Sequence, residues 1–215
     1  MYILLVLLAA LVASYAFFPA LWLAASVMLA RLLTGLQRKT LTLDGDTWHY
    51  LEGGVSAGPV VVLLHGFGAN KETWLSYARH FTGTYRVIVP DLPGFGESAV
   101  QADGDYRVDA QVVRLQAFID ALGVDTLHLA GSSMGGMIAA RFGLESPRRL
   151  ASLTLMASAG IDAPQKTEFY QRMEAGTGKL IARNRAEFTT LMELVTHNPP
   201  PLPGALKRDL CADAI

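Results

Sequence analysis

A short glycine-flanked segment carries the residue type best suited to covalent chemistry. Residues 131–135 read Gly-Ser-Ser-Met-Gly, the Gly-x-Ser-x-Gly pattern in which a serine occupies a tight turn between a strand and a helix. A predicted strand before the segment and a predicted helix after it supply that setting. Gly131 and Gly135 remove side chains that would collide across the turn. Ser133 is therefore the predicted nucleophile, whereas Ser132 is out of register with both glycines.

A second glycine-rich segment could serve the same reaction. A tetrahedral intermediate of acyl transfer needs two backbone N–H donors aimed at its oxyanion. Met134, directly after the predicted nucleophile, is one expected donor, and Phe67 of a His-Gly-Phe-Gly sequence is the other. Gly66 and Gly68 let the backbone approach the substrate closely. His65 opens this sequence, and its place in a tight loop predicts a structural hydrogen bond and not the role of catalytic base.

A third segment follows another predicted strand. Residues 91–98 read Asp-Leu-Pro-Gly-Phe-Gly-Glu-Ser. Asp91 could serve as a catalytic acid, but the turn residues around it favour a structural carboxylate that accepts backbone N–H bonds. The glycines of this segment do not form the Gly-x-Gly-x-x-Gly pattern, so no nucleotide site is predicted.

The elements that must position these segments alternate along the chain. Short aliphatic runs predict strands buried on both faces, and periodic apolar patterns between them predict helices. A further strand pair precedes them, joined by a turn at 44–46. The predicted strands are 41–43, 47–51, 60–64, 85–89, 127–130 and 150–156, and the predicted helices are 70–81, 108–122 and 134–145. This alternation predicts an α/β fold, with a mostly parallel sheet and helices on both faces.

Composition excludes some functions. The chain has 215 residues, with 18 basic and 19 acidic side chains, and this balance does not favour a nucleic-acid partner. Cys211 is the only cysteine, so no internal disulfide and no cysteine metal cluster can form.

The N-terminus is apolar over an unusual length. No charged residue occurs from Tyr2 to Ala30, and a helix of that length would reach about 43 Å, more than a hydrocarbon core of roughly 30 Å. We expect a retained single-pass transmembrane anchor at 1–30, with a cleaved signal peptide or a buried or interfacial helix as alternatives. Basic residues follow at Arg31, Arg38 and Lys39, which favours a cytoplasmic position for the catalytic part. The expected domains are this anchor, a core at 31–160 and a lid segment at 161–215.

Together these motifs resemble the α/β-hydrolase fold family of serine hydrolases. The glycine segments at 65–68, 91–98 and 131–135 have the order of that family, and Trp74-Leu75-Ser76 and residues 108–111 add to the likeness. Over about residues 40–160 the chain is similar to membrane-anchored monoacylglycerol lipases and to bacterial lipases. The resemblance implies hydrolysis of lipid or small ester substrates, a lid and no cofactor or metal.

One part of the family pattern is missing. The family's acid and histidine follow the serine, yet His197 is the sole histidine after Ser133 and lies beside a proline run, and Asp162 is a weak candidate for the acid. About 60 residues of strand and helix would complete the fold, so we expect a chain truncated at its C-terminus and poorly active. The alternatives left open are an inactive binding or scaffold protein with this fold, a cofactor-free haloperoxidase and a C–C hydrolase.

Overall fold

A computed structural model describes residues 2, 13–15, 17–43, 45–98, 104–162, 164–178 and 180–196. The chain divides into two compact units. One comprises residues 29–161, and the other comprises 1–28 together with 162–215. Each unit is described by itself.

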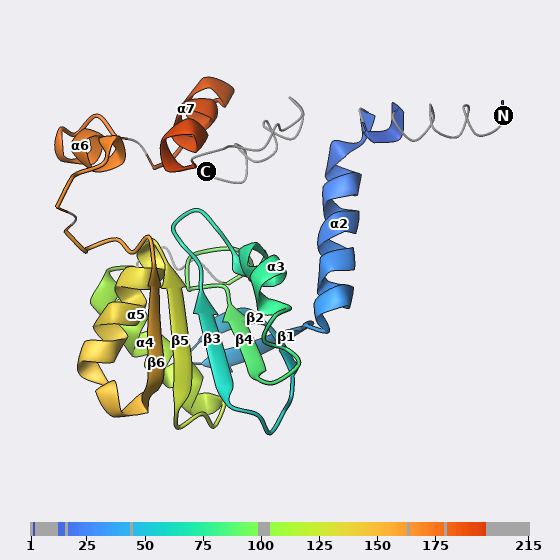
Figure 1. Ribbon diagram of the computed structural model, residues 1–215, viewed down its shortest axis with the longest axis vertical. Helices are drawn as coiled ribbons and strands as arrows, with labels where there is room; N and C mark the ends of the chain where they lie inside the picture. The colour runs from blue at the N-terminus through green and yellow to red at the C-terminus, as the bar shows by residue number, and fades with distance from the viewer. Residues whose placement is uncertain are drawn as a thin grey trace. The chain divides into compact units, whose positions relative to one another are not determined.

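The 29–161 unit is built on one sheet of six strands in the order β1-β2-β4-β3-β5-β6 (Figure 1). β1 and β2 are antiparallel to each other, and β2 is antiparallel to β4, whereas the pairs β3–β4, β3–β5 and β5–β6 are parallel. The strands are β1 Gln37–Leu43, β2 Asp46–Gly54, β3 Val60–Leu64, β4 Arg86–Pro90, β5 Leu127–Ser132 and β6 Leu150–Met156.

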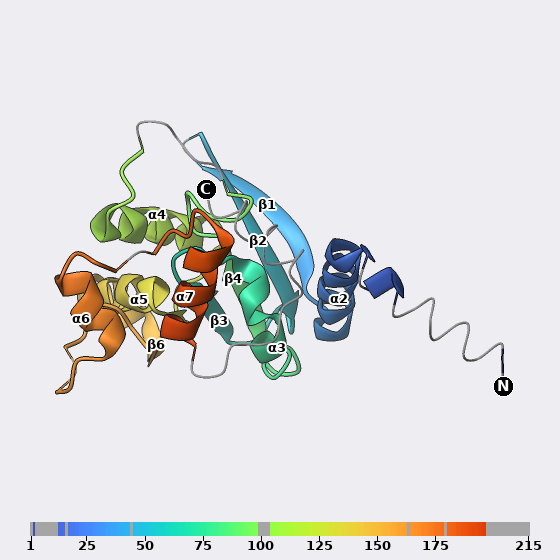
Figure 2. The same cartoon turned by 90° about the horizontal axis from the view of Figure 1, so that it is seen from above.

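Helices cover both faces of this sheet. α4 (Val108–Ala121) and α5 (Met134–Glu145) lie on one face, and α3 (Leu75–Ala78) lies on the other (Figure 2). On the α4 and α5 side, buried aromatic and aliphatic residues form the main hydrophobic core, in which Trp48 stacks on Phe118 with ring centroids 4.4 Å apart. This arrangement confirms the predicted α/β fold with a mostly parallel sheet.

The observed boundaries of the helices and strands confirm some of the predicted boundaries and correct others. β3, β6 and α5 span the predicted residues, and Gly123 follows the end of α4 with a φ of 66°. The predicted helix over 70–81 is wrong. Its place is taken by a 3₁₀ turn, η1 (Lys71–Trp74), and the single turn of α3. Lys71 and Trp74 are both buried, and a 3₁₀ turn places residues three apart on the same side.

The N-terminal helix differs from the predicted anchor in its bounds. α2 runs over Pro19–Thr34, 16 residues, and so continues past residue 30. Most of residues 1–16 lie outside the described part of the chain. Within the part that is described, no helix has both the length and the apolar character needed to cross a membrane. The transmembrane anchor therefore stays a prediction.

The C-terminal segment contributes two short helices. α6 (Glu168–Glu174) begins after Thr167, whose hydroxyl accepts the N–H of Tyr170, and α7 (Arg185–Val195) begins after Asn184, whose side chain accepts the N–H of Glu187. Both N-terminal residues are of the types that cap helices. His197, the proline run and Cys211 lie outside the described residues, and the lid assignment of 161–215 stays a prediction.

Candidate active site

Three loop segments meet at one edge of the parallel sheet. β3 and β5 pair with Leu64 opposite Gly131, and β3 pairs with β4 so that Val62 lies opposite Ile88. The carboxyl ends of these neighbouring strands therefore lie side by side, and the segments 65–68, 91–98 and 131–135 emerge together. The carboxyl edge of a parallel sheet is where α/β proteins commonly bind ligands.

Ser133 occupies a strained turn between β5 and α5. Its φ is 51° and its ψ is −116°, a left-handed conformation that non-glycine residues rarely adopt. Three backbone bonds hold it there. Its N–H donates to the Met156 carbonyl at 3.0 Å, and its own carbonyl accepts the N–H groups of Met137 at 3.1 Å and Ala159 at 3.0 Å. The residue is exposed, so its hydroxyl can be reached from outside.

The glycines around Ser133 are required by space. A Cβ on Gly131 would lie 2.1 Å from the Gly135 carbonyl oxygen, and a Cβ on Gly135 would lie 2.4 Å from that of His65. Both neighbours are backbone atoms, which cannot rotate away. Gly136, which the sequence reasoning missed, faces a side chain instead, since its Cβ would lie 2.7 Å from Ser158 Oγ and 2.8 Å from Ser158 Cβ. A glycine after the motif at the start of a helix was the only available signal for it.

The 65–68 segment lies alongside Ser133. A Cβ built on Gly66 would be 3.2 Å from the Ser133 Cβ and 3.8 Å from its Oγ. Gly68 has a φ of 67°, so the chain turns there in a conformation that suits glycine. The Phe67 side chain is 42% exposed, and its ring meets that of Phe95 edge-on at 5.5 Å.

His65 is buried and bonded to backbone through both ring nitrogens. Nε2 accepts the N–H of Leu92 at 3.0 Å, and Nδ1 lies 2.8 Å from the Gly66 carbonyl oxygen. Since Nε2 accepts, Nδ1 must carry the proton and donate. Burial lowers the pKa of the His65 imidazole, which favours this neutral form. Both nitrogens are occupied, so the ring serves structure, as expected for this position.

The bond to Gly66 has a geometric consequence. The Gly66 carbonyl and the Phe67 N–H belong to one planar peptide group, and in a trans peptide they point in opposite directions. No cis peptide occurs among the described residues. By fixing the Gly66 oxygen, His65 also fixes the direction of the Phe67 N–H.

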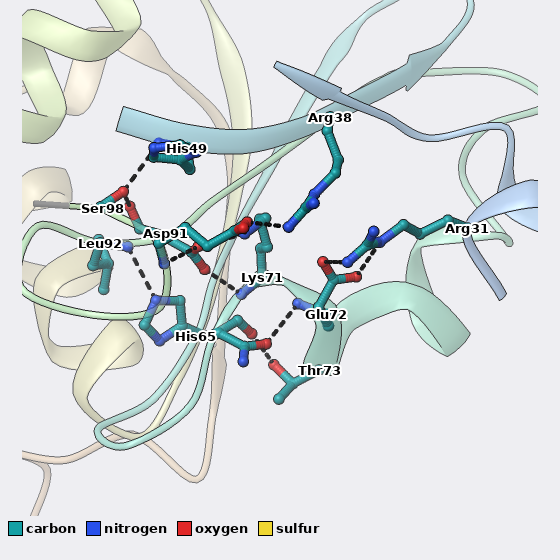
Figure 3. A network of polar contacts seen from close by, with 12 residues as sticks. Arg31, Arg38, His49, His65, Lys71, Glu72, Thr73, Asp91, Leu92 and Ser98 are labelled. Atoms are coloured by element: carbon teal, nitrogen blue, oxygen red, sulfur yellow. Dashed lines mark hydrogen bonds and ion pairs between the residues drawn. The ribbon is translucent and has the colours of Figure 1, made fainter. Parts of the chain in front are cut away.

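Asp91 is fully buried at the centre of a polar network (Figure 3). Its carboxylate accepts the backbone N–H of Lys71 at 2.7 Å and of Glu97 at 2.9 Å, and it pairs with the Lys71 ammonium. A Cβ on Gly96 would lie 2.3 Å from the carboxyl carbon, so the loop closes tightly around this group. The carboxylate is committed to holding the 91–98 loop.

Lys71 is the second residue that sequence reasoning missed. Its side chain is 3% exposed, and its ammonium contacts Asp91 and, at 2.6 Å, Glu97. The bond from Lys71 lowers the pKa of the Glu97 carboxyl, despite an opposing effect of burial. Lysine is rarely buried, and no pattern in the sequence distinguishes this one from a lysine in a solvated turn.

No histidine or carboxylate of the described residues is hydrogen-bonded to the serine hydroxyl. Among the described residues, Ser133 Oγ has no hydrogen-bond partner, and the His128 ring contacts Ser152 instead, at 2.8 Å. His197 lies outside the described residues, and Asp162 is an exposed residue of the other unit. The structure brings together Ser133, Phe67 and the glycines, and it describes no histidine or acid bonded to the serine.

A mostly parallel sheet with a serine turn at its carboxyl edge is the architecture of an α/β hydrolase. The chain belongs to the alpha/beta hydrolase fold family, which matches residues 59–178.

Relatives within this family include several hydrolases. The chain is 36% identical over 174 residues to Lipase 1 of Psychrobacter immobilis, covering 80% of this chain and 55% of that protein. It is 30% identical over 174 residues to monoacylglycerol lipase abhd6-A of Xenopus laevis, covering 80% and 52%. It is 38% identical over 119 residues to 2-hydroxy-6-oxo-6-phenylhexa-2,4-dienoate hydrolase of Comamonas testosteroni, covering 54% and 41%. The chain thus spans about half the length of these relatives.

A solved structure with the same fold is that of a membrane phospholipase A, described as a bacterial virulence factor. The two superpose with a TM-score of 0.85 at 40% sequence identity, covering 98% of this chain and 68% of that one.

Proposed function

We propose that this chain carries the nucleophile and oxyanion-binding parts of a serine ester hydrolase. One observation supports this above the others: Ser133 is held in a strained, exposed turn while the Gly66 backbone lies beside its hydroxyl. That strain needs a reason, because left-handed non-glycine residues cluster at functional sites.

In the proposed reaction Ser133 Oγ attacks the ester carbonyl carbon. The carbonyl oxygen becomes an oxyanion, which the N–H groups of Phe67 and Met134 stabilise. A histidine takes the serine proton and delivers it to the leaving alcohol, and an acid orients that histidine. Water then hydrolyses the acyl-enzyme by the reverse proton transfers. We propose that this histidine and acid belong to the part of the protein that is not described.

We propose lipid-like esters as the substrates and a membrane as their source. Support comes from the names of the lipase and phospholipase relatives and from the apolar N-terminal run, in which α2 carries no charge before Arg31. The basic residues that follow favour a cytoplasmic catalytic unit.

A fluorophosphonate probe, which reacts with activated serines, tests the proposal. We expect slow labelling of the 215-residue chain that increases when free imidazole is added as an external base. Ser133→Ala should abolish the labelling, and Ser132→Ala is the matched control that should retain it. Labelling that survives in Ser133→Ala would exclude Ser133 as the nucleophile.

A C–C hydrolase is the second candidate, because one relative is a dienoate hydrolase at 38% identity. The two are separated by assaying the whole protein with a p-nitrophenyl ester and with a 2-hydroxy-6-oxo-dienoate. Turnover of the dienoate alone would favour the second candidate.

A further inference from the structure

We propose that Lys71 is a positioning residue for the Phe67 amide, acting through Asp91, Leu92 and His65. The proposal rests on the proposed function, since it gives the Phe67 N–H its role. Within the described part of the chain, Lys71 bonds to Asp91 and Glu97 and not to the serine turn, so it acts at a distance.

Lys71 ties together two loops that leave neighbouring strands. It belongs to the chain after β3, and its partners Asp91 and Glu97 belong to the chain after β4. Both ends of Lys71 bind the same carboxylate, because its backbone N–H donates to one oxygen of Asp91 and its ammonium pairs with the other (Figure 3). The ammonium also reaches Glu97 at 2.6 Å. Without this cation, the buried Asp91 carboxylate would lose its counter-charge, whereas Glu97, whose side chain is 43% exposed, would keep its pair with Arg38.

The contacts of Asp91 also constrain Leu92, the residue that follows it. The N–H of Leu92 donates to His65 Nε2 at 3.0 Å, and Leu92 is fully buried. Nearby, the side chain of Gln111 donates to the Pro93 carbonyl at 2.9 Å, which fixes the other side of Leu92. The position of the Leu92 N–H therefore depends on anchors on both sides, and Lys71 supplies the charged one.

The last step passes through the histidine ring. While Nε2 accepts from Leu92, Nδ1 keeps the proton and holds the Gly66 carbonyl at 2.8 Å. If Leu92 moves, the ring can turn or exchange tautomer, and the Gly66–Phe67 peptide is free to flip. A flipped peptide would point an oxygen where the proposed oxyanion needs an N–H. Lys71 thus controls a backbone donor that it never touches.

The first test reads the geometry and needs no activity. Spectra of chains labelled with ¹⁵N-histidine report the tautomer of His65, and amide hydrogen exchange reports protection of the Leu92 N–H. In Lys71→Met we expect His65 to populate other forms beside the Nδ1–H tautomer. We also expect the Leu92 N–H to exchange at least about 10-fold faster than in the wild-type chain, after correction for any change in global unfolding. Lys39→Met removes a lysine from an exposed pair with Glu52 and is the control that should change neither signal.

A second variant keeps the test valid if Lys71→Met does not fold. In Lys71→Met/Asp91→Asn no buried charge is left unpaired, but the new amide has a single acceptor oxygen, so it cannot accept both backbone N–H groups, of residues 71 and 97, that Asp91 accepts. We expect this chain to fold and still to show the altered His65 and Leu92 signals. Wild-type signals in a folded chain of either type would overturn the proposal.

The catalytic arm uses the whole protein and a soluble ester. We expect kcat to fall at least about 10-fold in Lys71→Met, approaching the loss seen when one oxyanion donor is removed, with KM nearly unchanged. Lys71→Arg, which keeps the charge, should restore part of kcat. An unchanged kcat alongside altered His65 signals would overturn the link to Phe67. If the wild-type protein hydrolyses no ester, the proposed function fails, and the histidine spectra still decide whether Lys71 positions the loop.

Discussion

The serine turn at 131–135 and the charged junction formed by Lys71, Asp91 and Glu97 stand at the same edge of the sheet but are held by different forces. The turn is held by backbone bonds and by the absence of room, since a Cβ on either flanking glycine would strike a carbonyl oxygen. The junction is held by the buried Lys71–Asp91 ion pair, to which the partly exposed Glu97 adds a second carboxylate. Steric confinement tolerates almost no change of shape, whereas an ion pair tolerates the loss of both partners better than the loss of one.

The largest expected effect comes from a substitution that disrupts the serine turn. Gly131→Ala places a Cβ 2.1 Å from the Gly135 oxygen, and we expect it to lower the free energy of unfolding by more than about 4 kcal/mol, measured by urea denaturation. Gly68→Ala is the comparison, because no atom lies within 4 Å of its Cβ and only the φ of 67° is unfavourable. That change should cost about 1–2 kcal/mol. Similar costs at the two glycines would contradict a steric basis.

The second largest expected effect comes from a substitution that removes the cation of the charged junction. Lys71→Met leaves Asp91 buried without a cation, and we expect a loss of about 3–5 kcal/mol in the free energy of unfolding. Lys71→Met/Asp91→Asn should recover part of this loss. Lys39→Met, at a lysine whose side chain is 45% exposed, should cost less than about 1 kcal/mol. A double variant that is less stable than the single one would show that the pair does not act as a unit.

A pH series sharpens the comparison at His65, which joins the two regions. Burial lowers the pKa of His65 below its ordinary 6.5, with Lys71 adding to the shift and Asp91 opposing it. The unfolded chain therefore binds the proton more readily than the folded chain. The contribution of neutral His65 to the free energy of unfolding is complete above about pH 6.5 and falls as the pH drops below that value, by at most about 1.4 kcal/mol per pH unit. Urea denaturation between about pH 5.5 and 7.5 measures this fall, and His65→Gln should lack it. If the free energy of unfolding varied with pH in the same way in both chains, His65 would not be the cause of the fall.

The smallest expected effect has the opposite sign. Ser133→Gly relieves a φ of 51° that a serine adopts only under strain, so we expect the protein to gain about 1 kcal/mol while losing its proposed nucleophile. Ser132→Gly, in β5 beside it, should instead lose about 0.5–1 kcal/mol. Thermal unfolding of the pair tests this, and a destabilised Ser133→Gly would mean that the turn carries no strain.

The same contrast explains how much the sequence could predict. The motif of the serine turn occupies five consecutive residues, so the turn and its flanking strand and helix can be predicted from a short window, although Met156 and Ala159 also bond to Ser133. β3 and α5 have the residues predicted for them because a short aliphatic run of five residues predicts a buried strand and a longer apolar segment predicts a helix. β1 begins four residues earlier than predicted, since Gln37 to Thr40 are polar and exposed and give no apolar alternation.

The charged junction depends on contacts between distant segments. Lys71 and Asp91 are 20 positions apart, and nothing local indicates that the lysine is buried. The predicted helix over 70–81 is also replaced there by a 3₁₀ turn, in which both Lys71 and Trp74 are buried. The contacts that bury Lys71 come from residues 91 and 97, outside any window that local propensity can read.

Strand β6 has one further consequence. In the described part of the chain it pairs only with β5, so it is the outermost strand, and Leu153 and Met156 are 39% and 37% exposed. Along such a strand every second amide points outward to solvent. In the 215-residue chain, deuterium uptake along β6 should alternate residue by residue between slow and rapid, and an extended peptide or a further strand that paired with β6 would slow the rapid set alone.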